Sequence, residues 1–149
     1  MIIRAAEQLD IDAIVRVDNA CFNTPWSIDA IKHEICENKL ADFMIACDEE
    51  NNIIGYIGIW TLLDECQINK IAVMPEKRKI GIGKTILNHV IELTRDMGVK
   101  SWYLEVRESN TAAQALYRSA GFSSVGTRKN YYINPVEDAV LMSLEEADA

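Results

Sequence analysis

A glycine loop between a strand and a helix is the segment whose residue types point most directly to chemistry. Gly81 and Gly83 allow the backbone to approach an anion closely and to adopt positive φ. Free N–H groups at the start of a helix point toward such an anion. The sequence therefore predicts a cradle for phosphate groups, although glycines also occur in ordinary strand-to-helix turns. The predicted cradle comprises Arg78, Lys79, Ile80, Gly81, Ile82, Gly83 and Lys84, three of them cationic.

The spacing of the loop argues against two common nucleotide sites. A nucleotide P-loop requires G-x-x-x-x-G-K-[ST], and a dinucleotide-binding fingerprint requires a third glycine that is missing here. ATP and NAD are therefore disfavoured. The pattern R-x-x-G-x-G, from Arg78 to Gly83, resembles the pyrophosphate loop of the GNAT superfamily of acetyl-CoA-dependent N-acetyltransferases.

Four further segments carry the same resemblance and are together more specific than the loop. Within the superfamily they resemble the bacterial ribosomal-protein-alanine N-acetyltransferases, and archaeal and eukaryotic N-terminal acetyltransferases share several of them. The resemblance covers residues 2–144. The segments are Pro25-Trp26-Ser27, Leu104-Glu105-Val106-Arg107 with Ser109-Asn110, Ala115-Leu116-Tyr117, and Asn130-Tyr131-Tyr132 with Glu137-Asp138-Ala139.

The resemblance implies two catalytic residues. Glu105 matches the general base of the family, and a charged residue in mid-strand is otherwise unfavourable; the alternative is a glutamate on a wetted sheet face paired with Arg107. An ordinary glutamate is a weak base toward an ammonium group, so we expect a water relay or a strengthened base. Tyr117 matches the proton donor to the CoA thiolate, or is an amphipathic core tyrosine. Full proton transfer from a phenol to a thiolate is uphill by about 2 kcal/mol, so hydrogen-bond stabilisation is the simpler role.

The resemblance also implies how acetyl-CoA, the cosubstrate, is held. Main-chain groups of Ile71, Ala72 and Val73 would bind the acetyl carbonyl and the pantetheine arm, and Asn110 would contact CoA or cap a helix. Backbone groups can face a ligand only where strand pairing lapses. We therefore expect the strands at 67–73 and 102–107 to splay apart; otherwise the apolar run is simply a core strand.

The substrate implied by the resemblance is the N-terminal alanine of a small-subunit ribosomal protein. An α-amino group is easier to deprotonate than a lysine by about 3.5 kcal/mol, which favours N-termini without excluding lysine. Trp26, Tyr131 and Tyr132 could line the peptide groove or pack in the core. Three alternatives stay open: a broader set of protein N-termini, a small-molecule amine, and a non-catalytic acyl-CoA-binding module.

Hydrophobic periodicity predicts the elements that position these residues. Apolar residues recur at helical spacing over 8–20, over 82–97 and from Asn110 to Gly121. A further helix is predicted after Ser27, which would cap it, with Ile28 and Ile31 on its buried stripe. The order of elements predicts an α/β fold with a central twisted mixed sheet of six to seven strands and about four helices on both faces, the order of the GNAT fold. Strands are predicted at 2–4, 43–47, 53–60, 67–73, 102–107, 122–127 and 139–144.

Composition limits the class of protein. The 149 residues fit one domain, with residues 145–149 expected to fray. The formal net charge of −8 disfavours direct nucleic-acid binding and would attract a basic peptide. No apolar run is long enough to span a bilayer, the N-terminus does not resemble a signal peptide, and the four scattered cysteines predict free buried thiols rather than a zinc site. We expect a cytoplasmic protein without a metal, and the oligomeric state stays open.

Overall fold

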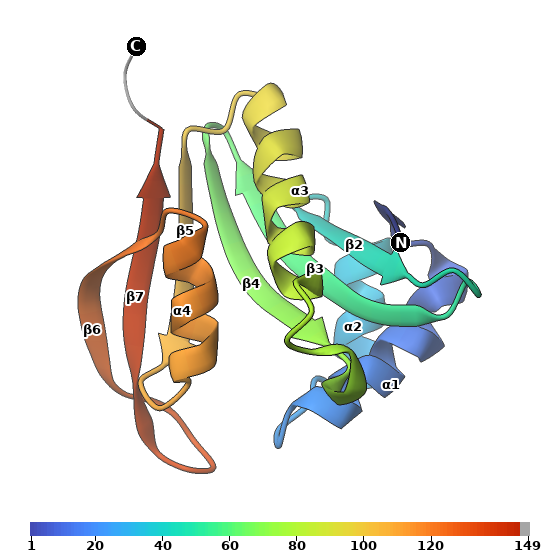
Figure 1. Cartoon of the computed structure of the whole chain (residues 1–149), viewed down its shortest axis with the longest axis horizontal. Coiled ribbons are helices and arrows are strands. Elements are labelled where there is room, and N and C mark those ends of the chain that lie inside the picture. Colours follow the sequence, from blue (N-terminus) through green and yellow to red (C-terminus); the bar gives the residue numbers. More distant parts are fainter. Residues whose placement is uncertain (147–149) are drawn as a thin grey trace.

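One mixed β-sheet organises the protein, and a computed structural model describes residues 1–146 of it (Figure 1). Within these residues the sheet has seven strands in the order β1-β2-β3-β4-β5-β7-β6, and four α-helices cover it. Among the strands of residues 1–146, only β4 and β5 pair in parallel. The strands are β1 (Ile2–Ala5), β2 (Ala41–Cys47), β3 (Ile53–Leu62), β4 (Glu65–Val73), β5 (Ser101–Arg107), β6 (Ser123–Tyr132) and β7 (Glu137–Glu145). The helices are α1 (Ile11–Cys21), α2 (Ile28–Cys36), α3 (Ile82–Asp96) and α4 (Thr111–Ser119), with short 3-10 helices at Gln8–Asp10 and Pro75–Lys77.

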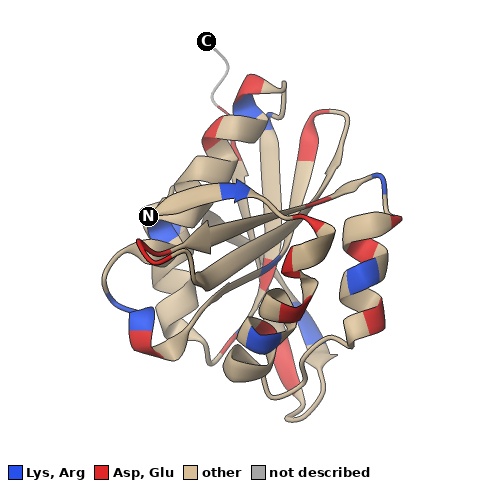
Figure 2. Cartoon of the chain, turned by 90° about the vertical axis from the view of Figure 1, so that its right-hand side faces the viewer, with Lys and Arg blue, Asp and Glu red and all other residues tan. Residues whose placement is uncertain are grey.

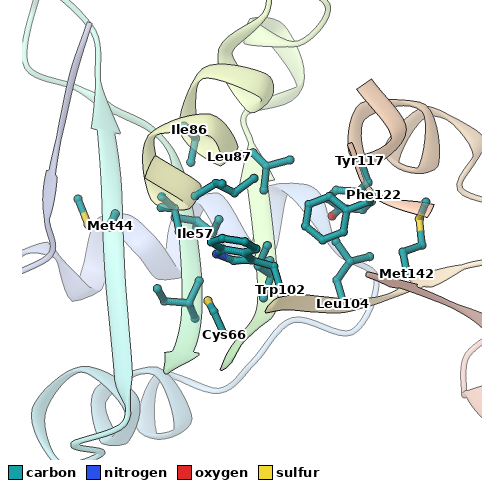
Figure 3. Packing of buried hydrophobic residues seen from close by; sticks show 14 of the residues in the cluster. Met44, Ile57, Cys66, Ile86, Leu87, Trp102, Leu104, Tyr117, Phe122 and Met142 are labelled. Atoms are coloured by element: carbon teal, nitrogen blue, oxygen red, sulfur yellow. The ribbon is translucent and has the colours of Figure 1, made fainter. Parts of the chain in front are cut away.

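Helices α3 and α4 cover one face of the sheet. Their apolar stripes pack on a core that contains Trp102, Leu104 and Phe122 (Figure 3). The indole N–H of Trp102 donates to Thr94 Oγ1 at 2.9 Å, so the one polar atom of this fully buried side chain is satisfied. This core fixes α3 and α4 over the centre of the sheet.

Helices α1 and α2 cover the other face. Their buried residues Ile14, Val17 and Ile31 form a second core with Phe43 and Tyr56 of β2 and β3. The Ser27 side chain accepts a hydrogen bond from the backbone N–H of Ala30 and caps α2. The predicted mixed sheet with helices on both faces is therefore confirmed.

The parallel strands β4 and β5 pair over only part of their length. Their ladder runs from Glu65 opposite Ser101 to Ile68 opposite Leu104, and within the described residues it does not continue. A β-bulge in β4 falls at the same point, between Ile68 and Lys70, which lie opposite Ile59 and Gly58 of β3. Because a bulge bends its strand, β4 turns away from β5 here. Figure 1 shows the two strands diverging, which confirms the expected splay.

Several sequence expectations are wrong in detail. The first turn over 8–10 is a 3-10 helix, and Ile28 of α2 is 49% exposed because it lies at the start of the helix rather than on the buried stripe. Strand β6 extends to Tyr132, since its bulges interrupt the alternation that marks a strand. The expected fraying is wrong for Glu145, which ends β7, and for Glu146, whose carboxylate pairs with Arg95. Residues 147–149 lie outside the described residues.

The state of the cysteines and the possibility of a membrane-spanning helix were the subject of two further expectations. Cys21, Cys36, Cys47 and Cys66 are all free thiols, but only Cys47 and Cys66 are buried: Cys21 is half-buried, and Cys36 is exposed because it ends α2. In the part of the chain that is described, no helix combines the length and apolarity needed to cross a membrane.

Candidate active site

Glu105 lies at the fork, which is the point beyond Ile68 and Leu104 where β4 and β5 part. Its neighbour Leu104 is the last residue of β5 that pairs with β4, so Glu105 is the first residue beyond the ladder. Leu104 and Val106 face the α3–α4 core, and the alternation of a strand therefore turns Glu105 to the opposite face of the sheet. The glutamate side chain is 20% exposed.

The surroundings of Glu105 come mainly from β6. Arg128 Nε lies 3.8 Å from Glu105 Oε1, a loose ion pair with a largely exposed arginine. The Glu105 carboxylate, chiefly as a hydrogen-bond acceptor, raises the pKa of the Tyr131 hydroxyl. The alternative pairing of Glu105 with Arg107 is not formed, because Arg107 pairs with Glu137 at 3.1 Å.

Tyr117 lies on the other face of the sheet, on the buried side of α4. Its ring is buried and packs against Phe122 with 6.0 Å between ring centroids (Figure 3). Within residues 1–146 no hydrogen bond to its hydroxyl is formed, and burial raises the pKa of this phenol, with a smaller contribution from Tyr132. The core tyrosine and the hydroxyl donor foreseen from sequence are therefore compatible roles of one side chain.

Tyr132, the last residue of β6, interacts electrostatically with both Glu105 and Tyr117. Burial raises its pKa to about 12, and repulsion from the Glu105 carboxylate adds to the effect. The guanidinium of Arg107 stacks over the Tyr132 ring at 4.4 Å and donates to the backbone oxygens of Pro135 and Ile133 at 3.0 and 3.2 Å. Arg107 therefore fixes the β6–β7 turn beside the fork, a role that the sequence analysis missed.

The glycine loop leaves the start of α3 open. Gly81 is the N-cap with φ of 86°, and the space around its missing side chain is empty. The first turn of α3 contains no acidic residue, and Lys84 is exposed. Uncapped amides with the positive end of the helix dipole form a site for an anion.

Gly83 differs from the sequence expectation. It is helical rather than of positive φ, and a Cβ there would meet Leu116 Cδ2 of α4 at 3.4 Å. The second residue of positive φ in the loop is Lys79, at 66°. The expectation of positive φ at Gly83 is therefore wrong, and a Cβ at this position would make an ordinary van der Waals contact with α4.

Ile71, Ala72 and Val73 lie on the splayed part of β4. Their outer edge pairs with β3, where Val73 lies opposite Gly55, and their inner edge has no strand partner among residues 1–146. The Val73 carbonyl accepts from Arg78 Nε at 2.9 Å and from Cys21 Sγ at 3.3 Å. Arg78 thus holds the loop to the strand, in addition to any contact with an anion.

Two residues fix α4 next to the fork. Asn110 is the N-cap, and its Oδ1 accepts from the Ala113 N–H at 3.1 Å, so its amide nitrogen is left to meet another group. Gln114 donates through Nε2 to the backbone oxygens of Arg107 and Glu108 at 3.0 and 2.9 Å. The sequence contains no indication of this role for Gln114, because a buried glutamine on a helix cannot be distinguished from an exposed one by sequence pattern.

Trp26 lies in the segment between α1 and α2. It is half-buried, its ring packs at a tilt on Phe43, and its backbone N–H donates to Asp18 Oδ2 at 2.7 Å. Tyr131 is 45% exposed and packs edge-on against Tyr132. Trp26 and Tyr131 therefore each combine packing with an accessible surface, and their place in a peptide groove stays a prediction.

Two surface hollows differ in their relation to this site. One of about 390 Å³, lined by Leu9, Ile28 and neighbouring residues, lies on α1 and α2 and contains none of the predicted site residues. Another of about 290 Å³ is lined by Ile80, Gly81 and Ile82 beside the start of α3. Across the described residues, no group of three or more His, Cys, Asp or Glu side chains could hold a metal ion.

The arrangement can support transfer of an acyl group. A carboxylate and a phenol lie on opposite faces of the sheet at one fork, unpaired backbone lines the fork, and an anion site lies at its edge. An amine and an activated acyl group that enter from opposite faces would meet there, with a base on one side and a hydrogen-bond donor on the other.

Comparisons with known proteins agree with this chemistry. A family model described as the acetyltransferase (GNAT) family matches residues 11–122. The [ribosomal protein bS18]-alanine N-acetyltransferase of Haemophilus influenzae is 37% identical over 145 residues, which cover 95% of this chain and 97% of that protein. The Escherichia coli K12 enzyme of the same name is 33% identical over 144 residues, 95% of each chain. The crystal structure of the Escherichia coli ribosomal-protein-S18-alanine N-acetyltransferase superposes with a TM-score of 0.91 and 30% identity, covering 99% of this chain and 95% of the other.

Proposed function

The chain belongs to the acetyltransferase (GNAT) family, and from this premise we propose that it acetylates the N-terminal alanine of ribosomal protein bS18. Acetyl-CoA is the acetyl donor that this family implies. The acceptor is the one named for the relatives from Haemophilus influenzae and Escherichia coli, which match nearly the full chain. Transfer is direct, from the thioester to the amine.

The residues at the fork fit acetyl-CoA. The uncapped amides from Ile82 to Lys84 would bind its diphosphate, and the free inner edge of β4 at residues 71–73 would hold the pantetheine arm and the acetyl carbonyl. When bound, acetyl-CoA supplies an activated acyl carbon. The chain supplies orientation, hydrogen-bond donors and a base.

Glu105 accepts the proton that the acceptor ammonium must lose, directly or through a water molecule. The amine lone pair then attacks the acyl carbon, the C–N bond forms and the C–S bond breaks. The nitrogen gives up a second proton as the amide forms, and this proton passes through solvent to the CoA thiolate, so that the products are the amide and CoA as a thiol. Tyr117 stabilises the departing thiolate by donating a hydrogen bond from its hydroxyl. Because burial raises the pKa of Tyr117, hydrogen bonding rather than full proton loss is the role that its environment favours.

Charge supports a basic peptide as acceptor. The net charge of the chain is −8, and Figure 2 shows acidic positions spread over the helices without a continuous basic band on that face. A negative field concentrates positively charged ligands and repels nucleic acid. An N-terminal α-amine also costs about 3.5 kcal/mol less to deprotonate than a lysine at the same pH.

The position of Glu105 at the fork, across the sheet from Tyr117, is the observation that carries this proposal. The test incubates the protein with acetyl-CoA and a synthetic peptide of the bS18 N-terminus that contains an internal lysine. Tandem mass spectrometry should locate one acetyl group on the α-amine. The same peptide with a blocked N-terminus is the control and should stay unmodified; acetylation of both peptides, or of neither, would contradict the proposal.

A further inference from the structure

A buried charge cluster joins β4 to helix α1 on the face opposite α3. Asp18 of α1 is fully buried, and Lys70 Nζ lies 2.7 Å from its Oδ1. The hydroxyl of Tyr56 on β3 donates to the same oxygen at 2.5 Å. Buried charges persist only where each has partners, so this cluster is a fixed part of the structure.

The cluster also holds the segment of residues 22–27 between α1 and α2. The second oxygen of Asp18 accepts the backbone N–H of Trp26 at 2.7 Å. The ammonium of Lys70 lies under the rings of Phe22 and Trp26, at 4.2 and 4.7 Å from their centroids. Two rings of one segment thus close over a single lysine.

Lys70 is placed where this contact affects the fork. It directly follows the β4 bulge, on the part of the strand that has left β5, and its side chain is 11% exposed. Farther along the same part of β4, the Val73 carbonyl accepts from Cys21, at the end of α1. The 22–27 segment is therefore attached to the strand whose free edge lines the fork.

The ammonium is held by the Asp18 carboxylate and by the faces of two rings. Its Nζ is buried and pairs with Asp18 Oδ1 at 2.7 Å. Burial accordingly lowers the pKa of Lys70, while Asp18 opposes that effect. A neutral side chain in its place would leave the Asp18 carboxylate buried without a counter-charge and the two rings without their cation.

We propose that Lys70 is a positioning residue that fixes residues 22–27 as one wall of the peptide-acceptor site. The proposal rests on the proposed function, in which the peptide approaches the fork from the Glu105 face. Lys70 acts through Phe22, Trp26 and Asp18 and takes no part in proton transfer. It sets the affinity for the acceptor peptide.

The test compares Lys70→Met and Lys70→Arg with the wild type in steady-state kinetics, with the bS18 peptide and acetyl-CoA varied in turn. Lys70→Met keeps the length of the side chain and removes its charge. Its KM for the peptide should rise about tenfold, because a 22–27 segment that is ordered only about a tenth of the time lowers the apparent affinity by that factor. Its kcat and its KM for acetyl-CoA should stay within about twofold of wild type. Lys70→Arg should restore most of the peptide affinity.

A matched control and a second readout separate positioning from stability. Arg4→Met removes another ion pair, to Asp10 at 2.8 Å, and should lower stability without changing the KM for the peptide. Hydrogen–deuterium exchange of residues 22–27 should quicken in Lys70→Met and not in Arg4→Met, whether or not the peptide is the right acceptor. A wild type without activity refutes the proposed function, whereas unchanged exchange or an unchanged peptide KM in folded Lys70→Met refutes the role of Lys70. If Lys70→Met does not fold, Phe22→Leu is tested instead, because it keeps the ion pair and removes one ring. An increase in both the exchange rate of residues 22–27 and the peptide KM would support the proposal. If both stay unchanged, the proposal is overturned.

Discussion

Replacing Glu105 by glutamine separates the chemistry of the fork from its stability. Glutamine has the shape of glutamate and can still meet Tyr131, but it cannot accept a proton from the acceptor amine. A positioned general base contributes about 10²- to 10⁴-fold to a rate, which corresponds to about 3 to 5 kcal/mol of activation free energy. We therefore expect kcat to fall by about a hundredfold or more.

The cost of this substitution in stability should be far smaller. The only ion pair that Glu105 makes within residues 1–146 is the 3.8 Å approach of Arg128, whose side chain is 58% exposed. Exposed pairs of this kind contribute about 0.5 kcal/mol or less after solvent screening. The free energy of unfolding and the dissociation constant of CoA should therefore stay close to wild type.

The assay measures initial rates of peptide acetylation, chemical denaturation and calorimetric titration with CoA on the same samples. Glu108→Gln is the control, because it removes an exposed carboxylate of the same charge three residues farther along the chain. It should acetylate at the wild-type rate. A Glu105→Gln variant as fast as Glu108→Gln would exclude Glu105 as the base, and a large loss of stability would mean that its surroundings are misassigned.

Three further results are expected. Tyr117→Phe should lower kcat by about a hundredfold with little change in melting temperature, because the lost hydroxyl makes no hydrogen bond within residues 1–146; equal rates would remove it from the mechanism. Gly81→Ala should lower the free energy of unfolding by about 1 to 2 kcal/mol and weaken CoA binding, because φ at this residue is 86°. Gly83→Ala should not destabilise the fold in thermal melts, because Gly83 is helical and the new Cβ would lie 3.4 Å from Leu116. Hydrogen bonding with Arg4 lowers the pKa of Asp10, so the contribution of Asp10 to the free energy of unfolding is present above the ordinary carboxyl pKa and is lost as pH falls through the lowered pKa. Between about pH 5 and pH 2 the wild type should therefore lose more unfolding free energy than Arg4→Met. Parallel losses in the two proteins would contradict this.

Local sequence patterns predict the parts of this fold that depend on local causes. The alternation of Trp102, Leu104 and Val106 places Glu105 on the opposite face of its strand, as the structure has it. Asn110 and Ser27 cap their helices because short polar side chains satisfy the first amides. The order of elements follows from the same local patterns, whereas the splay of the two parallel strands is predicted from the family resemblance.

The parts that depend on long-range contacts could not be predicted. Asp18 and Lys70 are 52 positions apart and resemble solvated charges in the sequence, yet they meet in the interior because the sheet brings β4 under α1. The bulge in β4 has no local signal, since it depends on the register with β3. The pairing of Arg107 with Glu137 rather than Glu105 depends likewise on how the β6–β7 turn folds back.

A crystal structure with a bisubstrate analogue tests the central claim most directly. The analogue joins the sulfur of CoA, through an acetyl linker, to the α-amine of the bS18 N-terminal peptide. We predict its diphosphate on the amides of Ile82 to Lys84, its linker between β4 and β5 beside Glu105, and its peptide against residues 22–27. An analogue bound elsewhere, with the fork between β4 and β5 empty, would contradict the account.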